Sequence, residues 1–219
     1  DREQPTRLVD LVAAQAGQTA LEAFWALYLS GGFDEAVALR ALDHPNPHVR
    51  RWTVRLLGDE RQTTPSIAHK LAQMAADEPE VEVRSQLAST ARRLPTGDCL
   101  PIVAALLGRR EDASDIHLPG LLWWALEAHA GDHEAVLAAC AQPVLWNTAI
   151  TFEKATLPQN VMRRWAMLAT RADLLACARL LELAPDEAAR QRLVASFVQA
   201  SEGRPLPPLP DELAEALGK

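Results

Sequence analysis

The stretch Asp43-His-Pro-Asn-Pro-His-Val-Arg50 and its counterpart Asp77-Glu-Pro-Glu-Val-Glu-Val-Arg84, which begins 34 positions later, decide the fold. Both fit the pattern D-x-P-x-x-x-V-R. The proline ends the preceding helix, because the residue before a proline disfavours the α region. Val49, Trp52 and Leu56 then fall on one apolar stripe of the following helix. The pattern predicts a helix, a tight turn and an antiparallel helix, and it predicts that this unit repeats.

Similar helix pairs are expected along the rest of the chain. A helix pair exposes an apolar face that it cannot bury alone, so we expect neighbouring pairs to stack into a curved α-α superhelix with the second helices on its concave side. The first helices are expected to begin near residues 34, 65, 100, 133 and 172. The second helices are expected at 48–58, 81–94, 116–130, about 144–170 with a break near Pro158, and 186–201. With an opening pair at 5–15 and 19–30, the prediction is about six helix pairs.

The composition agrees with an all-α chain. Hydrophobic residues make up 48% and charged residues 23% of the 219 positions, which is typical of a folded protein. The 15 prolines favour helices that are interrupted at regular places, while β-branched residues rarely alternate as they do in strands. The net charge of −7 disfavours a nucleic-acid surface, which needs clustered positive charge, so no nucleic-acid partner is expected.

The end of the chain differs in composition from the repeats. Residues 1–203 are predicted to form the helical-repeat domain, and 204–219 a separate tail. The proline-rich stretch 204–210 cannot be helical, and we interpret it as an extended linker rather than a ligand of a proline-recognition domain. Asp211 is then expected to cap a short amphipathic helix.

The charged residues of the two turns are candidates for a structural ladder between repeats. Asp43 and Asp77 can accept hydrogen bonds from the N–H groups at a helix start, or pair with an arginine of their own or the next repeat. Arg50 and Arg84 are the arginines at matching positions. These four residues are predicted to act in structure, not in chemistry.

The six tryptophans are all expected on second helices. Tryptophan in a solenoid packs between repeats more often than it faces a partner, but exposed tryptophan is a common interface anchor. The adjacent Trp123 and Trp124 point about 100° apart, so we expect one in the core and one near the surface. The candidate interaction surface consists of Trp52, Arg55, Trp123, Trp124 and Trp165.

No pattern in the sequence indicates catalysis or a cofactor. Cys99, Cys140 and Cys177 lie far apart, show no CxxC or CxxCH spacing, and are expected to be buried as small hydrophobic residues. His133-Glu134 invites a di-iron interpretation, but such sites need several pairs, and a helix start explains this one better. No catalytic, cofactor-binding or metal-binding residue is therefore predicted.

Membrane insertion is not expected either. No apolar run approaches the roughly 18 residues that cross a bilayer. The first residue is Asp1 rather than methionine and no signal-peptide pattern follows, so Asp1 is interpreted as a cut point in something longer. The residues themselves do not specify a compartment.

Three stretches resemble a known family: 23–34, 43–57 and 115–127, the last containing Leu-Trp-Trp-Ala-Leu-Glu. They are similar to the HEAT-repeat region of planctomycete/verrucomicrobia-type membrane-bound dehydrogenase-domain proteins. In that family a sugar-dehydrogenase-like β-propeller precedes the repeats and a c-type cytochrome domain often follows. The resemblance implies a HEAT-like, armadillo-type solenoid that acts as a non-catalytic scaffold in a periplasmic or membrane-associated protein. Its partners would be another protein or neighbouring domains of the same chain.

Two other functions stay open from the sequence. Some alkylpurine DNA glycosylases consist of HEAT-like repeats, and Trp123, Trp124, Arg84 and Asp115 could stand for their aromatic, basic and acidic groups. The net charge disfavours that alternative, and a salt-dependent DNA titration separates it from a scaffold. A lyase or chaperone-like repeat that clamps a cofactor-bearing partner is the other alternative.

One position departs from the expected helix pattern. Gly120 lies where a bulky apolar residue is expected.

Overall fold

The computed structural model describes residues 8–12, 17–203 and 207–218. Residues 8–12 are helical, and the remaining opening segment lies outside the described residues. The first helices of the pairs are α3 (Glu35–Leu42), α5 (Pro65–Asp77), α7 (Thr96–Leu107), α9 (His133–Cys140), α11 (Arg171–Glu182) and α13 (Asp211–Gly218). The second helices are α2 (Gly17–Leu29), α4 (Pro47–Asp59), α6 (Val81–Ala91), α8 (Leu118–Ala128), α10 (Leu157–Leu168) and α12 (Glu187–Ser201). Two 3₁₀ segments join them, η1 (Arg110–Ser114) and η2 (Pro143–Trp146).

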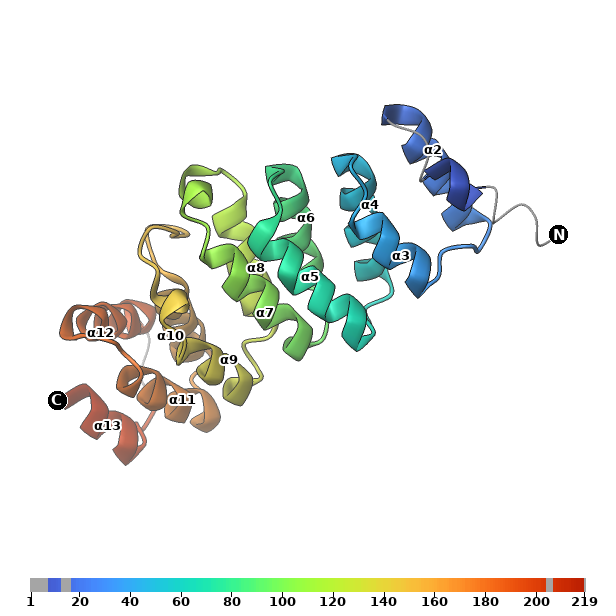
Figure 1. Ribbon diagram of the computed structural model, residues 1–219. Helices are drawn as coiled ribbons and strands as arrows, with labels where there is room; N and C mark the ends of the chain where they lie inside the picture. The colour runs from blue at the N-terminus through green and yellow to red at the C-terminus, as the bar shows by residue number, and fades with distance from the viewer. Residues whose placement is uncertain (1–7, 13–16, 204–206, 219) are drawn as a thin grey trace.

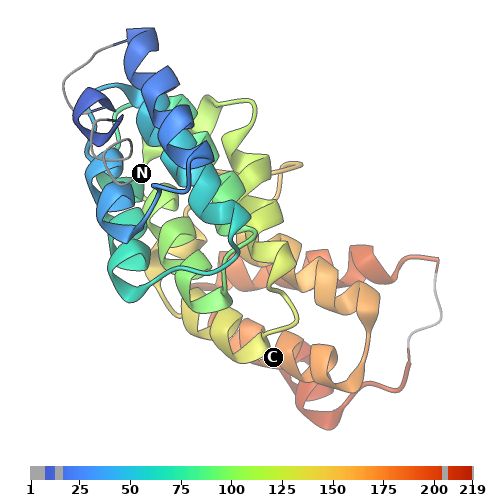
Figure 2. The ribbon, with the colours of Figure 1, turned by 90° about the vertical axis from the view of Figure 1, so that its right-hand side faces the viewer.

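These helices form two parallel rows. Each first helix packs on the next first helix, from α3 to α13, and each second helix packs on the next second helix, from α2 to α12. Figure 1 shows that the two rows run along the length of the molecule. Figure 2 shows the N-terminal helices at one end and the C-terminal helices at the other. The predicted all-α helical-repeat superhelix is confirmed. We call the two layers the first-helix row and the second-helix row.

Short polar side chains begin several of these helices. Asp34 accepts a hydrogen bond from the backbone N–H of Val37 at 2.8 Å, at the start of α3. Thr170 and Asp173 form a capping box at the start of α11, in which each side chain satisfies the other residue's backbone N–H. Such caps provide hydrogen-bond acceptors for backbone N–H groups of the first turn, which have no partner within the helix. The helix starts are therefore specified by residues that lie close to them in sequence.

The prediction of a second helix over 144–170 is wrong in its first half. The chain forms η2 and then an irregular connection with one isolated bridge between Phe152 and Ala155, and α10 begins only at Leu157. Pro158 lies in the first turn of α10, where a proline has no intrahelical N–H to lose. The proline therefore begins the helix and does not break it.

Gly120 accommodates that connection. A Cβ at Gly120 would lie 3.3 Å from the ring of Phe152, which packs over α8 and meets Trp124 edge-on at 6.2 Å. The missing bulky residue that the sequence led us to expect is thus supplied by the ring of Phe152, from a different segment.

The tail continues the array. Residues 207–210 are not helical, as predicted, while 204–206 lie outside the described residues. Helix α13 packs on α11, and its Leu213 is fully buried in the same core as the repeats. Asp211 is the first residue of α13. The short helix therefore adds a member to the first-helix row.

Candidate binding surface on the second-helix row

The side chain of Arg50 forms hydrogen bonds with the turn that precedes its own helix and with the next turn of the array. Its guanidinium donates to the carbonyl oxygens of His44 at 2.8 Å and Pro45 at 3.1 Å. It also donates to both carboxylate oxygens of Glu78, at 2.8 and 2.5 Å, in the following turn. This bidentate geometry is the strongest form of a charge-assisted hydrogen bond.

Arg84 repeats the arrangement one unit later and is buried. It donates to the carbonyl oxygens of Glu78 at 3.0 Å and Pro79 at 2.7 Å, and it holds Asp112 through two hydrogen bonds. The hydrogen bond to Asp112 is the main reason why the pKa of Arg84 is raised. We call the two links, Arg50–Glu78 and Arg84–Asp112, the arginine ladder.

The acidic partners in the ladder are not the predicted turn aspartates. Glu78 and Asp112 each lie 28 residues after their arginine. Asp43 instead pairs with Lys70 at 2.5 Å and is largely exposed, and Asp77 is the exposed last residue of α5. The prediction that the turn aspartates bind Arg50 or Arg84 is corrected, because stacking of the repeats brings the next residue of the motif toward the guanidinium.

Two tryptophans and an arginine meet on neighbouring second helices. The rings of Trp25 in α2 and Trp52 in α4 contact edge to face at a centroid distance of 5.2 Å. Arg55 lies one turn after Trp52, and its guanidinium carbon is 5.2 Å from the centre of that ring. Both rings are half-buried and Arg55 is exposed. A cation over the face of tryptophan is an attractive contact, so it adds to the packing of this cluster at the surface.

The other tryptophans divide between core and surface. Trp123 is buried and Trp124 is 45% exposed, which confirms the predicted split of the adjacent pair. Trp165 is fully buried and donates its indole N–H to the carbonyl of Ala130 at 2.8 Å. It is therefore removed from the candidate surface. Trp146 lies in η2 rather than on a second helix, which corrects the prediction for all six.

A cationic pocket opens where three second helices end. It has a volume of about 600 Å³ and lies at the C-terminal ends of α4, α6 and α8. Four arginines and a histidine dominate it, and no acidic residue lines it. The lining residues are Arg55, Arg61, Gln86, Ser89, Arg92, Arg93, Leu94 and His129.

A close approach of α4 and α6 builds this pocket. A Cβ at Gly58 would lie 2.7 Å from both Arg93 and Thr90, so only glycine leaves room for them. Arg93 crosses this point, where it pairs with Asp59 and donates to the carbonyl of Arg55 at 3.4 Å. The helix contact thus sets the position of the pocket wall.

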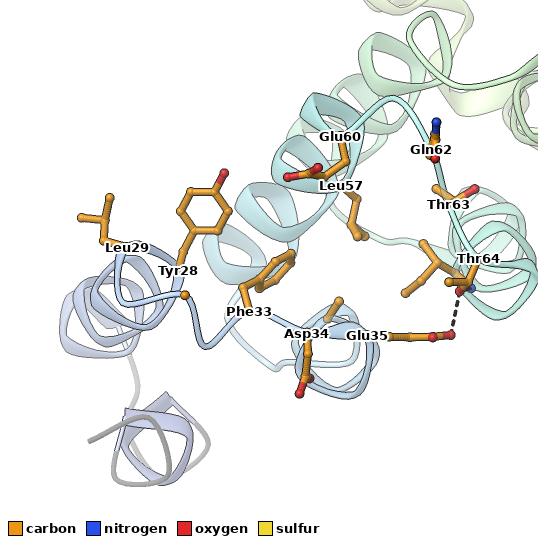
Figure 3. Close-up of a pocket in the computed structure, with 13 residues that line it drawn as sticks. Tyr28, Leu29, Phe33, Asp34, Glu35, Leu57, Glu60, Gln62, Thr63 and Thr64 are labelled. Carbon is orange, nitrogen blue, oxygen red and sulfur yellow. Dashed lines mark hydrogen bonds between the residues drawn. The ribbon is translucent and has the colours of Figure 1, made fainter. Parts of the chain in front are cut away.

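A second depression lies between α2 and α5, and its residues are drawn in Figure 3. It has a volume of about 540 Å³. Phe33 and Leu57 lie at its inner side, while Glu60 and Glu35 lie near its rim, where Glu35 accepts a hydrogen bond from Thr64 at 2.6 Å. Its apolar and acidic lining contrasts with the cationic pocket on the same repeats.

The two rows differ in charge. The described first helices, α3 to α13, carry 4 basic and 9 acidic residues. The described second helices, α2 to α12, carry 8 basic and 5 acidic residues. In a chain of net charge −7, positive charge is therefore concentrated on the second-helix row.

The residues considered for chemistry serve the packing. Burial raises the pKa of the thiols of Cys99, Cys140 and Cys177 to about 12, so they are protonated at neutral pH. His133 meets Asp173 at 2.8 Å, and Glu134 pairs with Arg179. The described residues include no cluster of three or more histidine, cysteine or acidic side chains that could bind a metal ion.

Three of the four residues that could stand for the groups of a glycosylase have structural roles instead. Arg84 is committed to Asp112, and Trp123 is buried. Asp115 accepts hydrogen bonds from the backbone N–H groups of His117 and Leu118, both at 2.8 Å, and so caps α8. Of the four, Trp124 alone is an exposed group on the second-helix row.

Sequence reasoning missed the cationic pocket. It noted Arg55 but not Arg61, Arg92 and Arg93, which all lie just beyond the C-terminal ends of α4 and α6. The available signal was that basic residues recur at the ends of two successive second helices, which must lie side by side when repeats stack.

Comparisons with protein-family models, with curated proteins and with solved structures found no match. Among the helices that the structure describes, none has the length and apolar character needed to cross a bilayer. The fold and the surface together define a helical-repeat superhelix with an aromatic and cationic second-helix row.

Proposed function

We propose that this chain is a non-catalytic interaction module whose second-helix row docks a protein partner or a neighbouring domain. The observation that carries the proposal is the cluster of Trp25, Trp52 and Arg55, whose side chains contact one another and are partly open to solvent. Tryptophan and arginine are the residue types most enriched among interface anchors. Trp124 supports the same row further along, 45% exposed on α8.

A site-specific photocrosslinker tests which row docks. Placed at Glu22, an exposed position on α2 one turn before Trp25, it is expected to give crosslinked adducts of defined mass in extract from the source organism. Placed at Ala138, an exposed position on α9 of the first-helix row, it is expected to give none of these adducts. Adducts from position 138 alone, or from neither position, contradict the proposal.

We further propose the context that the family resemblance implies. The module would be HEAT-like and would belong to a larger exported protein with a dehydrogenase propeller and a cytochrome domain. The reading frame around this segment tests that context directly. A propeller upstream and a CxxCH motif downstream are expected, and a frame that holds neither would refute this part of the proposal without affecting the docking surface.

A further inference from the structure

We propose that the cationic pocket at the ends of α4, α6 and α8 binds a short anionic peptide segment of the docking partner. The inference deepens the proposed function and rests on it, because it names the chemistry that the second-helix row recognises. The pocket is lined by Arg55, Arg61, Arg92, Arg93 and His129, with Gln86 and Ser89 as further hydrogen-bond donors.

Part of the positive charge in the pocket has no acidic partner among the described residues. Arg93 pairs with Asp59, and Arg55 lies over Trp52. Arg61 and Arg92 are exposed, and within the described part of the chain neither forms an ion pair. Like charges at close range repel, so an arrangement of this kind gains free energy when an anion enters.

Only one of these arginines forms a hydrogen bond with a helix end within the described residues. The C-terminal ends of α4 and α6 carry partial negative charge, which favours nearby cations. Arg93 meets that need, because it donates to the carbonyl of Arg55 in the last turns of α4. Arg61 and Arg92 also lie near these helix ends, but they make no such hydrogen bond to a described residue, so their guanidinium donors are open to an anion.

The residue type points to carboxylate or phosphate groups. A guanidinium is planar, always charged, and matches two oxygens of one oxyanion at once. Several such groups around one open pocket suit a segment with more than one negative charge. Acidic side chains and phosphorylated side chains of a peptide share this chemistry, and the two sources are separated by the test below.

A long nucleic acid fits the surface poorly. Nucleic acids carry closely spaced charges and need a continuous basic track. Acidic residues interrupt the basic residues of the second-helix row: Glu82 in α6 pairs with Arg51 in α4 at 3.3 Å, and Glu127 in α8 pairs with Arg164 in α10 at 3.6 Å. Arg163 in α10 and Arg192 in α12 also form no ion pair within the described residues, but neither lines the pocket. The positive charge around the pocket is therefore local, which favours a short segment.

The neighbouring aromatic cluster indicates what adjoins the anionic segment. Arg55 lines the pocket and also contacts Trp52, so the pocket continues into an apolar surface. A peptide with acidic residues followed by a bulky apolar residue would contact both. This combination commits the occupant to a protein segment rather than a small free anion.

Fluorescence anisotropy with labelled peptides tests the proposal on the full chain. The probes are a peptide of glutamates followed by leucine, the same peptide with phosphoserines, and the same peptide with glutamines. We expect the first or second to bind and the third not to bind. The double variant R61E/R92E is expected to weaken binding at least about tenfold, and the matched variant R110E/R171E, at exposed positions outside the second-helix row, to change it less than about twofold.

Four results would overturn the inference: no binding of either anionic peptide, equal loss in both double variants, equal binding of the glutamine peptide, or tighter binding of single-stranded DNA of matched charge. Inorganic phosphate that displaces the peptide at concentrations well below those of sodium chloride with equal ionic strength would reassign the pocket to a small anion and overturn it too. The thermal unfolding of both variants is measured alongside, because all four substituted arginines are exposed and folding is expected to persist. Absence of the crosslink at position 22 would instead refute the proposed function, so the two failures are distinguishable.

Discussion

The two halves of the superhelix have the same architecture, but different contacts join their adjacent helix pairs. From α3 to α8, buried or half-buried arginines join each turn to the next, as Arg50–Glu78 and Arg84–Asp112. From α9 to α12, no buried arginine pair joins the described turns, and adjacent pairs are joined by other contacts, such as the indole of Trp165 on Ala130, His133 on Asp173, and the exposed pair of Arg179 with Glu134. The helix rows continue through both halves, so the stacking does not depend on the ladder.

The difference has a clear origin in the third turn. Asp112 accepts the hydrogen bonds of Arg84, but Leu118 stands where the motif would place the next arginine, 34 positions after Arg84. The ladder ends there, and the long connection before α10 follows soon after. Both the Trp25–Trp52 pair and the cationic pocket lie in the half with the ladder. The docking surface that we propose therefore lies in the half with the ladder.

The largest expected effect is the loss of a buried ladder link. Replacing Arg84 with Met leaves the carboxylate of Asp112 buried without its partner, which costs about 3–5 kcal/mol of unfolding free energy. Urea unfolding measures this. The double variant R84M/D112L removes both charges and is expected to recover most of the loss. Equal stability of R84M and the parent protein would show that the ladder has no structural role.

A smaller effect is expected from the matching contact in the other half. Trp165→Phe removes the hydrogen bond to Ala130 and part of a fully buried ring, which costs about 1–3 kcal/mol. Urea unfolding measures it under the same conditions as R84M. A loss greater than that of R84M would reverse the ranking of the two halves.

The capping aspartate where the ladder ends is expected to contribute less. Asp115→Ala removes the cap of α8 and costs about 1 kcal/mol. Partial burial acts to raise the pKa of Asp115, but the hydrogen bonds from Leu118 and His117 outweigh it, and the net pKa is lowered. A carboxyl with a lowered pKa stabilises the fold above its unfolded pKa and loses that contribution as the pH falls through the folded value.

The stability difference between the parent and Asp115→Ala should therefore be constant near neutral pH and shrink below about pH 4. Unfolding midpoints across that range measure it, with Asp115→Asn as the variant that keeps part of the cap. A difference that grows toward acid pH would contradict the assigned role.

The smallest effect on stability is expected at Asp43, one of the two turn aspartates of the repeated sequence pattern. Lys70→Ala breaks the pair with Asp43, whose side chain is 67% exposed, and should change stability by less than about 1 kcal/mol. The same urea measurement serves, repeated at high salt to screen the pair. A cost comparable to that of R84M would restore Asp43 as a ladder residue.

The sequence predicted the helix rows because they follow from local rules. Prolines and small polar caps mark most helix starts, and apolar periodicity marks the packed faces. Side-chain partners across repeats were less accessible. The arginines at positions 50 and 84 were identified, but their acidic partners depend on how far each repeat rotates on the last, which no single repeat specifies.

The binding candidates divide for a similar reason. Amphipathic pattern placed Trp52 and Trp165 alike on second helices, yet one is half-exposed and the other fully buried. The connection before α10 folds back over α8 through Phe152, and no repeat pattern predicts such a contact. The pocket arginines lie at helix ends, where periodicity carries least information.

Hydrogen exchange with and without the acidic peptide tests most directly that the half with the ladder is the binding half. We predict slower amide exchange on binding at the ends of α4 and α6, over residues 55–61 and 86–94, and unchanged exchange over α10 and α12. Protection confined to α10 and α12, or to the first-helix row, would contradict the account.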